Sequence, residues 1–253
     1  GTFSFTNGNT FFYQLLVCFL LTFWLMSKYV NKLLLITATI CLVIAIPLSI
    51  SRTLLFSVII SLIFYFIALY FRPQFLKKLL TFSVFLIVTG VIVYNLEFVT
   101  TASEAFNSRI ESANESEGGL DGVLGNRYLG GFVKAISETK DIPFFGYGLG
   151  MGTNAGSQLL TGNRTFLIAE EEWARTIGEM GLLLGLSVII IRMTLSLSLS
   201  IKSFKVLKKH NVLPWMLLSF VLLIVPQGQW AQPTALGFAV MGAGLLIASL
   251  KQN

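Results

Sequence analysis

The sequence predicts an all-α membrane protein with about seven transmembrane helices and one large loop on the outer face. First, 55% of the 253 residues are hydrophobic and only 12% are charged, whereas about 25% of the residues in a soluble domain are charged. Second, the apolar residues form runs close to the ~20 that a helix needs to cross ~30 Å of hydrocarbon. Third, lysine and arginine residues cluster between alternate runs, as in the cytoplasmic loops of membrane proteins.

The predicted spans divide the chain into three parts. Residues 1–96 hold four N-terminal transmembrane helices, residues 97–179 form the large loop, and residues 180–253 hold three C-terminal helices. The apolar runs cover 10–27, 33–50, 53–71, 79–96, 180–201, 212–225 and 235–250. The chain begins at a glycine and lacks the basic start of a signal peptide, so we expect a fragment of a longer protein.

The charged residues predict the side on which each connection lies. Ten basic residues fall in alternate connections or at the C-terminal end, which assigns those connections to the cytoplasm. Segment 97–179 contains all twelve carboxylates and six bases, so it carries a net charge of −6. It is expected on the opposite face, together with residues 1–10, 49–52 and 226–234. The excess of bases elsewhere points to the membrane as the anionic partner and not to nucleic acid.

Two helices are predicted inside the large loop. Its first part, SRIESANESEGGLDG, is polar and glycine-rich and is expected to be irregular. From Asn126, apolar residues recur at helical spacing through NRYLGGFVKAISETK, which predicts an amphipathic helix that ends by Pro143. The glycine-rich segment FFGYGLGMGTNAG then predicts a packed turn or a close approach to a ligand. A second helix is expected to begin near Ala169 and to run into the fifth span.

Several kinds of site are disfavoured. No strand precedes the glycine run and no Gly-Lys-Ser/Thr closes it, so it does not predict a nucleotide-binding loop. The single histidine, His210, lies in a predicted cytoplasmic loop, and Cys18 and Cys41 lie inside apolar runs. The adjacent glutamates 170–172 point in different directions on a helix, so they do not predict a metal site. We therefore expect no metal and no cofactor.

Arginine and glutamate remain as candidate functional residues on the outer face. Arg52, in SISRT, is either a helix-end anchor or a phosphate ligand, since a planar guanidinium fits phosphate oxygens. Arg127 begins the amphipathic helix and forms either a surface salt bridge or part of the site. Arg109, Arg164 and Arg192 are expected to be structural or surface residues.

The second loop helix carries a candidate general base. Glu171, Arg175 and Glu179 are spaced four residues apart and share one helical face. Ion pairing alone explains this spacing, but the same face can also offer a carboxylate that removes a proton from a hydroxyl group.

Five segments occur in an order that carries further information. They are GTFSFTNGNTFFY, SISRT, NRYLGGFVKAI, IPFFGYGLGMG and EEEWARTIGEMGLLLGL. In this order and topology, the chain resembles the O-antigen polymerase and ligase superfamily, the C-type glycosyltransferases, over almost its whole length. The resemblance implies a polyprenyl-pyrophosphate-linked glycan donor, a glycan acceptor, and transfer on the periplasmic face of the bacterial inner membrane. It implies the bilayer and a chain-length regulator as partners.

The resemblance also implies roles for individual residues. The outward arginines of the family map onto Arg52 and Arg127, which would neutralise charge on the leaving pyrophosphate, with Arg175 as a further substrate-binding residue. In the mechanism that the resemblance implies, the acceptor hydroxyl attacks the anomeric carbon, polyprenyl pyrophosphate leaves, and the configuration at that carbon is inverted. Glu170 stands where ligases of the family carry a histidine, which favours a polymerase.

The base is predicted to be Glu170 first and Glu172 second, because pairing with Arg175 would make Glu171 a weak base. A ligase or a protein O-glycosylation enzyme of the same superfamily is an alternative. A solute transporter is another, and it would place ionisable groups near the middle of the membrane or break its helices in matched pairs. A purely structural membrane component is the last alternative.

Overall fold

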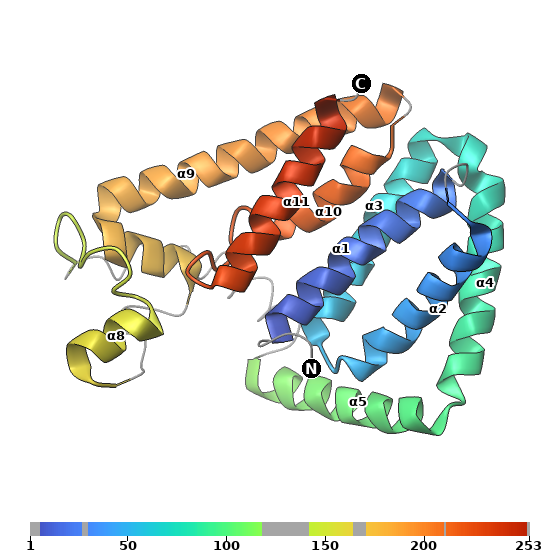
Figure 1. Ribbon diagram of the computed structural model, residues 1–253, viewed down its shortest axis with the longest axis horizontal. Helices are drawn as coiled ribbons and strands as arrows, with labels where there is room; N and C mark the ends of the chain where they lie inside the picture. Colours follow the sequence, from blue (N-terminus) through green and yellow to red (C-terminus); the bar gives the residue numbers. More distant parts are fainter. Residues whose placement is uncertain (1–5, 27–29, 118–141, 164–170, 210, 252–253) are drawn as a thin grey trace. The chain divides into compact units, whose positions relative to one another are not determined.

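The computed structural model describes residues 6–26, 30–117, 142–163, 171–209 and 211–251 (Figure 1). All regular secondary structure in these ranges is helical, so the all-α class is confirmed. The described chain forms two compact units. Unit 1 comprises residues 1–111, 199–222 and 240–253, and unit 2 comprises residues 112–198 and 223–239. The amphipathic helix predicted from Asn126 lies outside the described residues.

The N-terminal part of the chain forms a series of helices. They are α1 (Thr6–Leu25), α2 (Lys32–Leu48), α3 (Arg52–Phe71), the short 3₁₀ helix η1 (Pro73–Phe75), α4 (Leu76–Tyr94) and α5 (Glu97–Glu117). Ser51 ends the turn after α2 and caps α3, because its Oγ accepts a hydrogen bond from the Leu54 amide at 3.2 Å. This cap places Arg52 at the first position of α3.

Four described helices are long and apolar enough to cross a membrane, namely α1, α3, α9 (Glu172–Lys209) and α11 (Pro233–Lys251). A fifth would form if α4 and α5, which bend by 93° between Leu80–Tyr94 and Val99–Ser108, acted as one broken span. The apolar helices α2 and α10 (Leu213–Ile224) are shorter. These lengths are consistent with a membrane protein, but the predicted count of seven spans is not confirmed.

Small polar side chains lie between buried helices in unit 1. Ser219 of α10 is fully buried, and its Oγ lies 3.3 Å from Cys18 Sγ of α1 and 3.0 Å from Ser61 Oγ of α3. Buried hydroxyl and thiol groups of this kind allow close helix packing in an apolar solvent and hold neighbouring helices together by hydrogen bonds.

One expectation about the large loop is wrong. The polar stretch expected to be irregular is helical as far as Glu117, the last residue of α5. Alanine and glutamate favour helix and no glycine occurs between Glu97 and Glu117, so local propensity outweighs the low apolar content of this segment. α5 therefore extends the helical structure beyond the fourth predicted span.

The second loop helix does not continue straight into the fifth span. α9 consists of two arms joined at Gly181, whose φ of 77° and ψ of 168° are accessible essentially only to glycine. Trp173 and Ile177 of the first arm pack against Ile189 of the second arm in a buried cluster. The first arm is thus folded back along the second, and the bend is visible near the N-terminal end of α9 in Figure 1. The short helix α8 (Asn154–Thr161) precedes it in unit 2.

Candidate functional site

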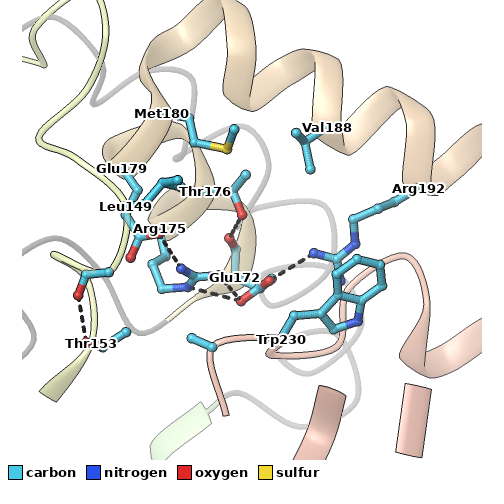
Figure 2. A pocket seen from close by; sticks show the side chains of 12 residues that line it. Leu149, Thr153, Glu172, Arg175, Thr176, Glu179, Met180, Val188, Arg192 and Trp230 are labelled. Carbon is cyan, nitrogen blue, oxygen red and sulfur yellow. Dashed lines mark hydrogen bonds and ion pairs between the residues drawn. The ribbon is translucent and has the colours of Figure 1, made fainter. Parts of the chain in front are cut away.

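A buried carboxylate in unit 2 pairs with two arginines. Glu172 begins α9, and its side chain is almost fully buried. Its Oε2 accepts hydrogen bonds from Arg175 Nη2 at 3.0 Å and Arg175 Nε at 3.2 Å. Its Oε1 accepts from Arg192 Nη1 at 2.9 Å. Figure 2 shows the two guanidinium groups reaching Glu172 from opposite sides. Both carboxylate oxygens are therefore already engaged in charged hydrogen bonds.

A second carboxylate completes the network. Glu179 Oε2 accepts from Arg175 Nη1 at 2.6 Å, and Glu179 Oε1 accepts from the Gly152 amide at 3.0 Å. The network therefore contains two arginines and two glutamates and is formally neutral. Three of the five N–H groups of Arg175 are directed at carboxylates, so two remain for a ligand.

Arg192 joins the network to the connection between α10 and α11. Its Nε donates to the Val225 carbonyl at 2.9 Å, and its Nη2 donates to the Gly228 carbonyl at 2.8 Å. Its guanidinium carbon also lies 3.9 Å from the centroid of the Trp230 ring, at cation–π distance. Arg192 thereby fixes three segments of unit 2 at one point: the first arm of α9, the second arm, and the connection 225–230.

The glycine-rich segment is a packed turn against the end of the first arm. The Tyr147 amide donates to the Gly178 carbonyl at 2.9 Å and the Gly148 amide to the Glu179 carbonyl at 3.0 Å. These bonds satisfy carbonyls that the break at Gly181 leaves without helical partners. Gly146 has a φ of 75°, and a Cβ there would lie 2.4 Å from the Glu179 carbonyl oxygen. The close packing explains why this position is glycine.

The network borders a pocket of about 270 Å³. Its charged wall is formed by Glu172, Arg175 and Arg192, while Met180 and Val188 form an apolar wall. In Figure 2 Met180 and Val188 lie above the ion pairs, and Trp230 lies below Arg192. Leu149 and Thr153 of the glycine-rich segment also line the pocket. A ligand here would meet apolar and charged groups together.

The predicted site residues are only partly brought together. Glu172 and Arg175 both line the pocket and pair with each other. Arg52 begins α3 in unit 1. Arg127 and Glu170 lie outside the described residues.

The expected pairing of Glu171 with Arg175 is wrong. Glu171 is exposed, and within the described part of the chain it forms no ion pair. Arg175 instead binds Glu172, three residues before it, and Glu179, four residues after it. Both spacings place residues on one helical face, so spacing alone could not choose between Glu171 and Glu172.

The sequence predicts a structural or surface role for Arg192, and the structure places it in the interior, where it joins three segments of unit 2 and also lines the pocket. The sequence did contain a signal, because Arg192 is the one charged residue in the predicted span 180–201. An ionisable residue inside an apolar span is costly and commonly marks a functional site. Its partner, twenty residues earlier, could not be identified from helical spacing.

Among the residues that the structure describes, no group of three or more His, Cys, Asp or Glu side chains could hold a metal ion. The charged groups of the pocket are suited instead to binding anions or hydroxyl groups, since guanidinium groups donate and carboxylates accept hydrogen bonds. Comparisons with protein-family models, curated proteins and solved structures found no match. The fold and the site thus define a helical, membrane-type protein with a pocket beside buried arginine–glutamate ion pairs.

Proposed function

We propose that this protein is an inverting glycosyltransferase that polymerises lipid-linked oligosaccharide repeat units into surface polysaccharide. The donor would be a polyprenyl-pyrophosphate-linked glycan, and transfer would occur on the outer face of the bacterial inner membrane. The observation that carries the proposal is the pocket in which Met180 and Val188 face a wall of arginine and glutamate. A ligand with a lipid part and a charged, hydroxyl-rich part matches both walls.

The arginines are proposed to stabilise charge on the leaving pyrophosphate. Arg175 lines the pocket and retains two N–H groups for phosphate oxygens. Arg52 and Arg127 are assigned the same task by the family resemblance. Removing one preorganised donor to developing charge typically costs on the order of 10²–10³ in rate. Arg52→Ala and Arg127→Ala should therefore lower polymer synthesis by about that factor, and lysine should restore only part of it.

The base is proposed to be Glu170, with Glu172 in a positioning role. Both oxygens of Glu172 accept hydrogen bonds from arginine, so few lone pairs remain for an acceptor hydroxyl. Glu170 occupies the position of the histidine in ligases of the resembling family. A positioned general base contributes about 10²–10⁴ in rate.

The test is polymer synthesis in detergent from purified lipid-linked repeat units, at matched amounts of folded protein. Glu170→Gln should nearly abolish product. Glu171→Gln is the matched control and should keep normal activity, because Glu171 is exposed and forms no ion pair with the residues that the structure describes. Equal activity in all three glutamine variants, including Glu172→Gln, would remove general-base catalysis from this segment. With lipid A-core or an acceptor protein added to the same reaction, product attached to that acceptor in place of polymer would identify a ligase or protein O-glycosylation enzyme.

A solute transporter is the second candidate, and one observation favours it. Arg192 and Glu172 form a buried ion pair in a helix long enough to cross a membrane. The two candidates differ in their need for two compartments. A glycosyltransferase makes polymer in detergent micelles, whereas a transporter shows activity only as movement of solute into sealed vesicles.

A further inference from the structure

The second arm of α9 carries an apolar surface of bilayer thickness. Exposed apolar side chains recur from Leu182 to Ile201, and Leu183, Ile191 and Leu197 are each more than 60% exposed. These twenty residues span roughly 30 Å as helix, which equals the thickness of the hydrocarbon core. Lys202 is the first charged residue after this surface, and Lys205, Lys208 and Lys209 follow it. One boundary of the apolar surface is therefore marked by lysines.

The opposite boundary is marked by an aromatic turn. Phe145 is 73% exposed and Leu149 is 78% exposed, although both are large apolar side chains. The backbone of this turn is fixed by its hydrogen bonds to Gly178 and Glu179, directly before the break at Gly181. The exposed side chains are thus held beside the start of the apolar surface of α9. Tyr and Trp are enriched at this level in membrane proteins, where their amphipathic rings meet the headgroups, and the same turn carries Tyr147, whose side chain is also exposed.

Arg192 lies about halfway between these two boundaries. Ten residues separate it from Leu182 and nine from Ile201, which places it roughly 15 Å from each end along the helix. An arginine at this depth is tolerated when protein groups surround it, and Arg192 is buried against Glu172 and Trp230.

Three backbone carbonyls close to Arg192 accept hydrogen bonds from protein side chains. Arg192 donates to the carbonyls of Val225 and Gly228, and Trp173 Nε1 donates to the carbonyl of Pro226 at 3.0 Å. Irregular backbone occurs at membrane depth only where it is buried in protein or lines a cavity, because lipid offers no hydrogen bonds.

We propose that the turn Phe144–Leu149 binds the lipid bilayer at its headgroup boundary, and that the Arg192–Glu172 pair lies near the middle of the hydrocarbon layer, enclosed by protein. The proposal rests on α9 crossing the membrane, and it concerns the pocket used in the proposed function without requiring the glycosyltransferase activity.

The test uses spin labels on single cysteines, in a Cys18→Ala/Cys41→Ala background reconstituted into phosphatidylcholine vesicles. Labels at Phe145, Leu183, Ile191 and Leu197 report depth through the ratio of collision rates with oxygen and with a water-soluble nickel chelate. A label at the exposed residue Asn163 is the aqueous control. All five side chains are exposed and none belongs to the ion pairs of Glu172, so the labels leave these pairs intact.

The oxygen-to-nickel ratio is expected to be largest at Ile191, smaller at Leu183 and Leu197, and smaller again at Phe145, but clearly above its value at Asn163. If Phe145 and Leu183 instead matched Asn163, the aromatic turn would stand in water and the proposal would be wrong. A ratio that rose from Leu183 through Ile191 to a maximum at Leu197 would also overturn it, because Arg192 would then lie near the outer boundary.

Discussion

Glu172→Gln is predicted to destabilise the protein through Arg192. The Glu172 side chain is only 2% exposed and pairs with two arginines. Glutamine is neutral and has one acceptor oxygen, so both arginines lose the negative charge of Glu172 and only one of them can keep a hydrogen bond to this side chain. Removing one partner of a buried ion pair typically costs about 3–5 kcal/mol. Arg175 retains Glu179 at 2.6 Å, so the loss falls on Arg192 and should lie near about 3 kcal/mol.

This cost equals on the order of a hundredfold in the folding equilibrium constant. The assay is reversible unfolding in mixed micelles with increasing SDS, and Glu171→Gln is the matched control, with an expected change below about 0.5 kcal/mol. The Glu172→Gln/Arg192→Gln double variant should lose less stability than the sum of the single variants, because neither charge is left unpaired. If Glu172→Gln unfolded within about 0.5 kcal/mol of Glu171→Gln, the ion pair would not stabilise the folded-back arm.

Three further predictions concern the turn, the helix packing and the topology. Gly146→Ala forces a Cβ to within 2.4 Å of a backbone oxygen at a φ of 75°, so it should lower the free energy of unfolding by more than about 1–2 kcal/mol. Gly90 lies in helix α4 with open space around it, so Gly90→Ala is the control and should raise the free energy of unfolding by about 0.5–1 kcal/mol. Both are measured in the same SDS assay. Ser219→Ala removes hydrogen bonds to both α1 and α3 and should cost roughly 0.6–1.7 kcal/mol, and an unchanged unfolding midpoint would argue against these bonds. In intact cells an impermeant thiol reagent should label an exposed cysteine at Gln158 but not one at Lys205, and labelling of the latter would reverse the predicted orientation.

The helical class and the membrane character were determined by the sequence itself. Long apolar runs separated by lysine clusters leave helices as the simplest way to satisfy the backbone, whatever the tertiary packing. The glycine-rich segment was also interpretable as a packed turn, because several glycines at close spacing favour positive φ values and close approach. The structure bears this out at Gly146, Gly148 and Gly150, which all have positive φ.

The lengths of the individual helices were less predictable. Apolar runs predicted seven spans, but α2 has 17 residues and α10 has 12, which are shorter than a full crossing. α10 is almost entirely buried in protein, so its apolar character serves packing. Composition cannot separate a helix buried in protein from one that faces lipid, since both consist of apolar residues.

The charge partners were decided by the tertiary structure alone. Helical spacing allowed Arg175 to pair with either Glu171 or Glu172, and only the fold chose Glu172. The choice follows from the break at Gly181, which folds the first arm back and brings Arg192 to Glu172 from twenty residues away. Local sequence encodes contacts within about one helical turn. The Arg192–Glu172 ion pair instead depends on the angle between the two arms of α9, which the backbone conformation of Gly181 sets.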